Sequence, residues 1–315
     1  MLKHLAIILY VSLAACATTP STSTPSKPAQ MATLTMEPLG GDIYVHHGAH
    51  LDIDEGYRGD ICNVSFIVGS KGVAVIDTGG SIKVGSALRN AIKAVTSLPI
   101  LYVINTHVHP DHVFGNAAFL ADKPAFVGHF KLADTMELRR EPYNKLNARL
   151  LGDDAIGTTL VKPTIVVKDT TELDLGNRIL TLKAQPTAHT NTDLTVLDSK
   201  TQTLWTGDLL FVERTPVIEG DIKNWISLID TLKNMALKHV VPGHGAIPAD
   251  WPTAFNNEQR YLSVLLADIR ANIKKGKTME TTMDTAAQSE KNNWQLFNIA
   301  NRRNINTIFP QLEWE

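Results

Sequence analysis

The sequence contains few cysteines, no surplus of positive charge and no short internal repeat. Its two cysteines, Cys16 and Cys62, are too few for a disulfide framework. Lysine and arginine are scattered along the chain and the formal net charge is −2, so the basic footprint of a nucleic-acid-binding protein is missing. These absences exclude a small disulfide-stabilised fold and a nucleic-acid partner, and they leave a small-molecule substrate as the expected partner.

The remaining composition is that of an ordinary globular protein. Hydrophobic residues make up 43% and charged residues 20% of the 315-residue chain, which is enough to bury a large core. The length permits one or two domains. The fold must therefore be inferred from the order of apolar runs and turns.

The first sixteen residues have the features of a targeting segment. Lys3 gives a short basic start, and residues 5–13 form an apolar core too short to span a bilayer as a stable helix. The segment ends in Leu13-Ala14-Ala15-Cys16, which resembles a bacterial lipobox with cleavage before Cys16 and lipid attached to its thiol. An ordinary signal peptide that ends near Ala17 is the alternative.

Residues 17–32 are expected to form a tether behind this anchor, because residues 17–30 are rich in serine, threonine and proline and cannot bury a core. The sequence thus predicts a periplasmic protein attached to a membrane only through a lipid on Cys16. The residue after the lipidated cysteine is Ala17 rather than aspartate. By the rule of bacterial lipoproteins, this favours the outer membrane. Cys62 is then an unpaired thiol, more typical of a small buried residue than of a nucleophile.

Strands and helices are predicted in two series along the rest of the chain. Residues 34–76 contain short strands, and a helix capped by Ser81 follows. Strands recur between residues 165 and 205, with an amphipathic helix at 224–232 and further helices after it. Because strands precede helices in both halves, we expect two packed sheets with helices outside. This is an α+β four-layer αββα sandwich with a helical C-terminal extension.

Three stretches are expected to be irregular or short. Residues 48–60 are long for a hairpin loop and form a candidate flap over a site. Residues 141–159 are predicted as surface helix and loop, and residues 204–205 only as a short strand. Tyr57 and Arg58 in the flap are candidate substrate contacts, with solvated loop residues as the alternative.

A cluster of imidazoles and a carboxylate follows the apolar run 101–104. The cluster is Thr106-His107-Val108-His109-Pro110-Asp111-His112, at the C-terminal end of a predicted buried strand, where α/β proteins bind ligands. Zinc prefers these ligand types, and iron and manganese accept them in part. His107 and His109 can point two rings at one ion, whereas Asp111 and His112 project elsewhere. The cluster therefore indicates two metals.

Three further potential ligands stand where apolar runs end. They are His189 after Ala188, Asp208 after Gly207, and His244 between two glycines. Gly207, Gly243 and Gly245 permit the backbone to approach an ion closely. Each lies in the same kind of position as the first cluster.

The ordered set His107-x-His109-x-Asp111-His112, His189, Gly207-Asp208 and Gly243-His244-Gly245 resembles the metallo-β-lactamase superfamily. The resemblance extends from about Gly41 to Gly245 and includes Ile76-Asp77-Thr78-Gly79. The whole set is highly specific, although each piece alone is weak. The resemblance implies a metallo-β-lactamase-like domain over residues 33–249, with residues 250–315 as a helical extension packed on the same domain.

The resemblance also implies a binuclear zinc site and a role for each residue. One metal would be held by His107, His109 and His189, the other by Asp111, His112 and His244, with Asp208 bridging them. Asp77 would steady a ligand or loop without binding a metal. Two divalent ions lower the pKa of a shared water enough to supply hydroxide, and the catalytic Asp111 would orient it and pass a proton to the leaving group. A purely structural metal site is the alternative, but such sites are usually closed and four-coordinate.

The choice among hydrolases depends on finer features. Asp208 stands where the better-known β-lactamase classes carry cysteine or serine, and it resembles the ligand of glyoxalase II, lactonases and related esterases. The C-terminal segment lacks the basic and aromatic pattern expected for glutathione thioesters. Residues 207–216 and parts of the C-terminal segment look like quinoprotein relay system zinc metallohydrolases, which are exported and associated with quinoprotein dehydrogenases. Glu213 and Arg214 are candidate substrate contacts there, with solvated loop charges as the alternative.

Three functions are compatible with the sequence. The first is an exported binuclear zinc hydrolase of a small ester, thioester or lactone. The second is a β-lactamase, and the third is a non-hydrolytic metal protein that accompanies a quinoprotein dehydrogenase. The sequence alone does not separate them.

Overall fold

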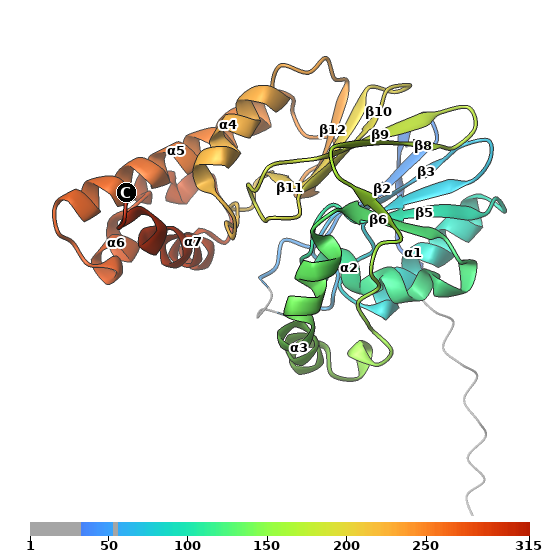
Figure 1. Cartoon of the computed structure of the whole chain (residues 1–315), viewed down its shortest axis with the longest axis horizontal. Helices are drawn as coiled ribbons and strands as arrows, with labels where there is room; N and C mark the ends of the chain where they lie inside the picture. Colours follow the sequence, from blue (N-terminus) through green and yellow to red (C-terminus); the bar gives the residue numbers. More distant parts are fainter. Residues whose placement is uncertain (1–32, 53–55) are drawn as a thin grey trace, which may run out of the picture. The chain divides into compact units, whose positions relative to one another are not determined.

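Two β-sheets form the centre of the structure (Figure 1). The structure is a computed structural model, and it describes residues 33–52 and 56–315. The predicted signal segment, its Cys16 and the tether up to residue 32 lie outside the described residues. The first sheet has its strands in chain order: β1 (Glu37–Gly40), β2 (Ile43–His46), β3 (Val64–Val68), β4 (Val73–Ile76), β5 (Ile100–Ile104), β6 (Ala125–His129) and β7 (Ile165–Val167). The second sheet has the order β12-β11-β10-β9-β8, formed by β8 (Thr170–Asp174), β9 (Ile179–Ala184), β10 (Leu194–Asp198), β11 (Thr203–Phe211) and β12 (His239–His244).

Parallel pairing brings the functional ends of the strands together. In the first sheet β1 to β4 pair antiparallel, whereas β4, β5, β6 and β7 pair parallel. In the second sheet β11 and β12 are the parallel pair. The carboxyl ends of parallel strands meet at one edge of a sheet, and ligands usually bind there.

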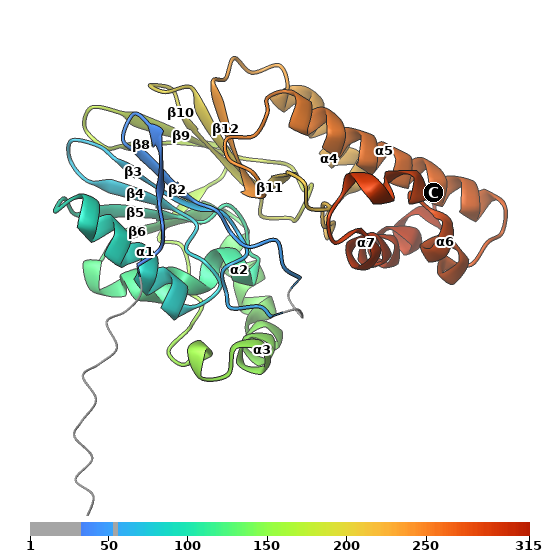
Figure 2. The same ribbon diagram turned by 180° about the vertical axis from the view of Figure 1, so that it is seen from behind.

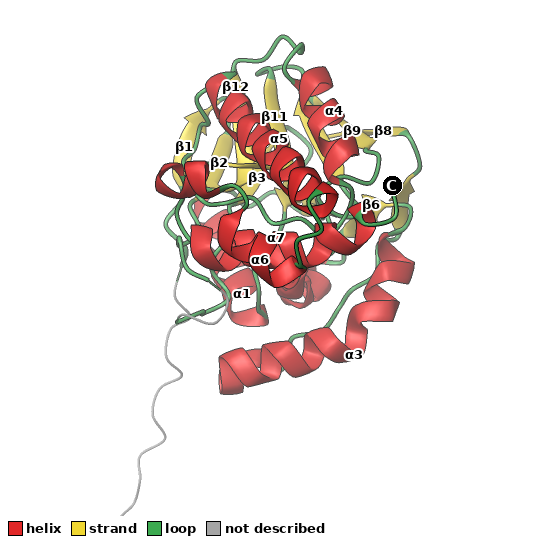
Figure 3. Ribbon diagram, turned by 90° about the vertical axis from the view of Figure 1, so that its left-hand side faces the viewer, coloured by secondary structure: helices red, strands yellow, loops and turns green. Residues whose placement is uncertain are grey.

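Helices cover the outer faces of the sheets (Figures 2 and 3). The first half of the chain contributes α1 (Ile82–Val95), α2 (Pro110–Val113), η1 (Phe114–Asp122), α3 (Leu132–Leu151) and η2 (Gly152–Ala155). The second half contributes α4 (Ile222–Leu232), α5 (Thr253–Lys274), α6 (Met279–Thr285), η3 (Gln288–Asn293) and α7 (Phe297–Leu312). None of the helices in the described part of the chain combines the length and hydrophobicity needed to cross a membrane.

Clusters of buried apolar side chains hold the two sheets and the helices together. Along β4, Val73 and Val75 pack toward α1, whereas Ala74 and Ile76 face the second sheet. This is the two-residue alternation of a strand that is buried on both faces. The outer face of the second sheet packs on α4, α5 and α7 through a third cluster that includes Phe211. The predicted four-layer αββα sandwich with a helical C-terminal region is therefore confirmed.

Local signals explain where α1 begins. Ser81 precedes the helix and its Oγ accepts a hydrogen bond from the Val84 backbone N–H at 3.2 Å, which satisfies one of the free donors of the first turn. Leu88 and Ile92 lie one turn apart on the buried face. The cap and the apolar stripe together give the helix predicted after Ser81.

Two predicted stretches differ in the structure. The short strand expected at residues 204–205 continues to Phe211, and its nine residues are all buried. Gly207 has a φ of +52° and lies where the pairing of β11 with β12 shifts in register. A glycine at this place resembles a turn in the sequence, and the predicted strand therefore ended before it. The surface helix and loop expected at 141–159 are present, but the helical part continues α3, which runs unbroken from Leu132 to Leu151. Because few residues of α3 are buried, the apolar periodicity that marks a helix is weak there.

Candidate metal centre

The histidine motif lies between β5 and η1, at the carboxyl edge of the first sheet. His109 has an extended backbone and precedes the first residue of α2, Pro110. Proline is favoured in that position because the first helical residue needs no N–H partner. The turn into α2 separates His107 and His109 from Asp111 and His112, as the sequence predicted. His107 and His112 are fully buried, and Asp111 is nearly so.

The seven predicted ligands lie together, and they come from both sheets. Ligand atoms of His107, His109, His189 and Asp208 all lie within 4.8 Å of one another, and so do those of His112, Asp208 and His244. Asp208 belongs to both groups. Asp111 lies beside the second group, with its Oδ2 3.4 Å from His244 Nε2 and 3.6 Å from His112 Nε2.

Hydrogen bonds on the outer side of three rings fix which nitrogen faces inward. Nδ1 lies 2.8 Å from Asp77 Oδ2 in His112, 2.6 Å from the Val217 carbonyl oxygen in His189 and 2.7 Å from the Ile61 carbonyl oxygen in His244. Because these partners only accept, Nδ1 carries the proton in each ring. In the neutral form of each ring, Nε2 is then left with a lone pair directed into the centre.

His109 is turned the other way. Its Nε2 lies 3.0 Å from Glu219 Oε1, and its Nδ1 lies 3.0 Å from His189 Nε2. Since His189 donates from Nδ1, the neutral ring has only a lone pair to offer at Nε2. Two inward lone pairs at this distance repel each other unless a cation or a proton lies between them.

Buried atoms without hydrogen-bond partners also indicate that a cation belongs in the centre. Nε2 of His107, Nε2 of His112 and Oδ1 of Asp208 are buried and make no well-aligned hydrogen bond. Buried polar atoms are normally satisfied. Imidazole nitrogen and carboxylate oxygen are the donor types that divalent metals take. The donor set therefore fits a divalent metal.

The electrostatics of the centre favour positive charge. Burial lowers the pKa of His107 well below its usual range and that of His189 to about 4, so both rings are neutral at pH 7, the form that binds metal. Burial would also lower the pKa of His112, but the carboxylates of Asp208 and Asp111 raise it well above its usual value. A positive charge placed beside Asp208 is thus strongly stabilised.

Asp77 connects the end of β4 to the motif. Its Oδ1 accepts from the Thr106 backbone N–H at 2.8 Å, and its Oδ2 accepts from Thr106 Oγ at 2.7 Å and from His112 Nδ1. The residue has φ of +55°, a left-handed conformation that aspartate and asparagine tolerate better than most residues. Asp77 thus holds a ligand, and it is not among the residues that could bind the metal directly.

Two glycines allow the strands of the second sheet to approach the motif. A Cβ on Gly207 would lie 2.5 Å from Thr106 Oγ1, and a Cβ on Gly243 would lie 2.0 Å from Asp208 Oδ1. Both positions exclude a side chain. The sequence predicted close approach to an ion, whereas the structure shows close approach to Thr106 and Asp208.

A cavity of about 260 Å³ opens onto the centre. It is lined by five groups that could meet a substrate: Asp52, Tyr143, Arg214, Glu219 and Arg303. Of the predicted substrate contacts, only Arg214 is among the lining residues. Tyr57 is buried beside Gly80 and Arg58 is exposed.

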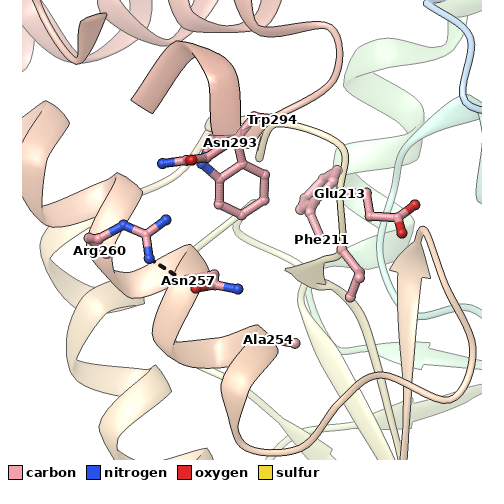
Figure 4. A pocket seen from close by; sticks show the side chains of 8 residues that line it. Phe211, Glu213, Ala254, Asn257, Arg260, Asn293 and Trp294 are labelled. Atoms are coloured by element: carbon pink, nitrogen blue, oxygen red, sulfur yellow. Dashed lines mark hydrogen bonds between the residues drawn. The ribbon is translucent and has the colours of Figure 1, made fainter. Parts of the chain in front are cut away.

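Glu213 lines a different cavity of about 380 Å³ that shares Phe211 with the first (Figure 4). Its carboxylate lies 3.3 Å from His50, and in the figure it points away from Trp294. Residues exposed to solvent, such as Asn257, Arg260 and Asn293, form much of this second wall. Glu213 and Arg214 are adjacent in the sequence but serve two different cavities.

Sequence reasoning missed several residues around the metal-facing cavity. Glu219 contacts His109 and also pairs with Arg139 at 2.5 Å, and Arg139 donates to Tyr143 Oη at 2.7 Å. These residues come from α3 and from the loop after β11, and no motif connects them. Arg303 belongs to α7 and was not among the predicted substrate contacts.

The comparisons with known proteins agree with this geometry. The model of the metallo-beta-lactamase superfamily matches residues 57–244, a range that contains all seven predicted ligands. The chain therefore belongs to the metallo-beta-lactamase superfamily, whose members are metal-dependent hydrolases. No curated protein matches the chain.

Solved structures show the same fold at low sequence identity. The stereoselective inverting sec-alkylsulfatase Pisa1 from Pseudomonas sp. is similar with a TM-score of 0.68 and 16% identity, over 88% of this chain and 50% of that one. The chain thus spans about half the length of this relative. A metallo-beta-lactamase from Pontibacter korlensis is similar with a TM-score of 0.57 and 16% identity, over 73% of this chain and 99% of that one. The metallo-beta-lactamase IND-7 is similar with a TM-score of 0.58 and 17% identity, over 73% of this chain and 97% of that one.

Proposed function

We propose that this enzyme is an exported binuclear zinc hydrolase that cleaves a small ester, thioester or lactone. The observation that carries the proposal is the arrangement of donors, in which two groups of ligand atoms share Asp208. A structural zinc site needs four donors and closes around one ion. Seven donors beside a cavity are better suited to two ions and a substrate.

Seven residues would hold the two zinc ions, as the family resemblance implies: His107, His109 and His189 on one side, Asp111, His112 and His244 on the other, and Asp208 between them. When bound, the ions supply a water of low pKa and polarise the carbonyl that is attacked. Iron or manganese would use the same donors.

The chain's own residues position the reaction. Asp111 lines the cavity, where its carboxylate would accept a hydrogen bond from the attacking water and pass the proton to the leaving group. Asp77 and the Val217 and Ile61 carbonyls keep three imidazoles in the required tautomer. Glu219 and Arg139 keep His109 against the cavity wall.

The finer assignment rests on sequence features. Asp208 in place of cysteine or serine supports an esterase-like centre of the glyoxalase II type. The stretch 207–216 and the C-terminal segment support a relationship to quinoprotein relay system zinc metallohydrolases, with a quinoprotein dehydrogenase as partner. The lipobox-like sequence before Cys16 supports a periplasmic enzyme anchored by lipid, in the outer membrane.

Metal content measured beside a hydrolysis screen tests the proposal. The soluble form from residue 31 would be analysed for bound metals and assayed with aryl esters, thioesters, lactones, nitrocefin and a secondary alkyl sulfate. We expect about two zinc ions per chain and turnover of an ester, thioester or lactone that a chelator abolishes and zinc restores. The alkyl sulfate is included because the sulfatase similarity covers more of the chain than the β-lactamase similarity.

The other outcomes separate the alternatives. Chelator-sensitive turnover of nitrocefin alone would favour a β-lactamase. Bound iron with no hydrolysis of any compound would reject both hydrolase functions and favour a metal protein that accompanies a quinoprotein dehydrogenase. A single zinc per chain with full activity would contradict the binuclear centre.

A further inference from the structure

The second cavity, of about 380 Å³, lies apart from the predicted metal ligands (Figure 4). The end of β11 and the two residues after it line one side, and α5 with the end of η3 lines the other. None of the seven predicted metal ligands is among the lining residues. The largest side chain of the wall is Trp294, which is 8% exposed. In the figure its indole lies between Phe211 on one side and Arg260 and Asn293 on the other, so the cavity offers a flat aromatic surface with polar groups at its margin.

A buried carboxylate fixes three of the lining side chains. Glu290 of η3 is 4% exposed, and its oxygens accept hydrogen bonds from Arg260 Nε at 2.9 Å and Arg260 Nη2 at 3.0 Å. The same carboxylate accepts from Asn293 Nδ2 at 3.3 Å and from Trp294 Nε1 at 3.2 Å. Burial would raise the pKa of Glu290, but these hydrogen bonds lower it. The wall is therefore ordered in advance, which reduces the entropy lost when a ligand binds.

These contacts leave one amide donor and one amide acceptor for a ligand. Asn257 Oδ1 accepts from Arg260 Nη1 at 2.9 Å, so the Nδ2 group of Asn257 is available to donate. Asn293 uses its Nδ2 group on Glu290, so its Oδ1 is available to accept. The charge of Arg260 is balanced by Glu290. An anion would find an acceptor at this wall and a cation would find a donor, whereas a hydroxyl group both donates and accepts and is suited to either amide.

We propose that the second cavity is a binding site for a neutral sugar ring, which stacks on Trp294 and forms hydrogen bonds through its hydroxyl groups to Asn257 and Asn293. A pyranoside has C–H groups on its faces and hydroxyl groups around its edge, the same distribution that the wall presents. The face of an aromatic ring is negative, so it attracts the weakly positive C–H groups. The site is separate from the proposed hydrolytic centre and does not depend on its activity.

A titration followed by nuclear magnetic resonance tests the inference. The five tryptophans each give an indole N–H signal in a proton–nitrogen correlation spectrum, and the signal of Trp294 is the one absent from Trp294→Leu. The probes are the methyl α-D-pyranosides of glucose, galactose and mannose. We expect at least one of them to shift the Trp294 signal to saturation, with a dissociation constant in the millimolar range.

Two neighbouring asparagines of α5 provide a matched pair of variants. Asn257→Ala removes the exposed donor and is expected to weaken binding of the glycoside by about 3- to 10-fold, the usual effect of one neutral hydrogen bond. Asn256→Ala is the control, because Asn256 is exposed, does not line the cavity and accepts from Lys233 on the surface. It is expected to leave the dissociation constant unchanged. Both substitutions are at exposed positions, so the comparison remains decisive even if Trp294→Leu does not fold.

Three results would overturn the inference. The first is the absence of a saturable shift of the Trp294 signal with every glycoside, and the second is equal binding by Asn257→Ala and Asn256→Ala. Tetramethylammonium and benzoate serve as a charged pair of probes, and tighter binding of either ion than of every glycoside is the third. None of these measurements uses ester hydrolysis, so the sugar site and the hydrolase function are tested separately.

Discussion

At the scale of single residues, the centre depends on carboxylates whose position is fixed by their neighbours. Asp208 is 4% exposed, and its two oxygens lie 3.1 Å from His112 Nε2 and 3.4 Å from His189 Nε2. Among the described residues, it is thus the one carboxylate that belongs to both donor groups. Burial would raise the pKa of Asp208, but the nearby histidines lower it well below its usual range, so the carboxylate is ionised throughout the neutral range.

Replacement of Asp208 tests its bridging role. Asp208→Ala removes a donor from both groups and is expected to release about one of two metal equivalents and most of the activity. Asp208→Asn retains the size of the side chain and loses its charge, so it separates an effect of packing from an effect of ligation. Metal analysis after gel filtration, with kcat/KM on the best ester, makes the measurement. Retention of two metals in Asp208→Ala would contradict the bridging assignment.

Asp77 offers a test of how a residue outside the ligand set affects the metals. Asp77→Asn suits the left-handed backbone at this position, but a neutral amide holds His112 less firmly than a carboxylate does. Removal of such partners typically costs 10- to 100-fold in metal affinity. We expect a loss of that size for the metal that His112 would hold, measured by competition with a chromophoric chelator. Unchanged affinity, with an unchanged circular dichroism spectrum, would show that Asp77 has only a packing role.

His129 predicts part of the acid sensitivity of the fold. Burial and then the charge of Lys131 lower the pKa of His129 from 6.5 to about 4, so the folded protein excludes a proton that the unfolded chain takes up near pH 6.5. This contribution to stability is full above about pH 6.5 and is lost as the pH falls toward 4. In His129→Gln the urea midpoint is expected to fall less between pH 7 and pH 5 than in wild type. Parallel curves for the two proteins would reject this role.

At the scale of elements, the C-terminal helices hold the segment that follows Asp208. Asn304 of α7 donates to the Pro216 carbonyl oxygen at 2.8 Å and accepts from the Ile218 N–H at 2.9 Å. Between these two residues, the Val217 carbonyl orients His189. The helical extension therefore supports a metal ligand, although it lies beyond the part of the chain that the family model matches.

Glu258 of α5 makes the corresponding contact with β11. It is fully buried, and its Oε1 accepts from the Phe211 N–H at 2.9 Å, while the Phe211 ring stacks on His244. Burial raises the pKa of Glu258 well above its usual range, which favours the neutral carboxyl group over the carboxylate.

A pair of variants tests this contact. Glu258→Gln keeps an acceptor and is expected to change the free energy of unfolding little. Glu258→Leu leaves the Phe211 N–H unpaired and is expected to cost about 1–3 kcal/mol, with lower kcat/KM. Urea denaturation at pH 7 compares them. Equal damage from both variants would mean that the ionised carboxylate matters instead.

The sequence predicted the elements best where the signal is local. The Ser81 cap and the periodicity after it predicted α1, and alternation predicted β4, because each feature depends on neighbours in the chain. The unbroken course of α3 to Leu151 and the full length of β11 were not predicted, for the opposite reason. The polar surface of α3 shows little period, and β11 continues past Gly207 only because β12 and Thr106 lie beside it.

At the scale of the whole molecule, the seven ligands were recognisable because the motif keeps their order, whereas the cavity wall was not. Glu219, Asp52 and Arg303 come from segments far apart in the chain, and only folding brings them to one cavity. Tyr57 and Arg58 show the converse, since a place in the flap did not put them in the lining. Spacing along a chain predicts donors that share a strand end, but not groups that approach from other elements.

The helical extension is also expected to be required for folding. Removing residues 250–315 would expose Phe211, Leu209 and Trp225, which are each at most 1% exposed in the whole chain, and an apolar patch of that kind promotes aggregation. We expect a chain of residues 31–249 to be insoluble or to lose cooperative unfolding by circular dichroism. A chain that ends at Leu312 is the control, because it loses only surface ion pairs of Glu315 with Lys223 and Arg270. A soluble, cooperatively unfolding 31–249 chain would show that the extension is dispensable.

The division of the donors between the two sheets has a consequence for how such an enzyme changes over time. His107 and His112 follow the first sheet, whereas Asp208 and His244 belong to the second. Any substitution that slides one sheet along the other alters the spacing of the donors, even from a distance. Drift in the apolar layer between the sheets, at Ile104 or Trp205 for example, is then a route by which metal affinity and turnover evolve while all seven donors stay the same.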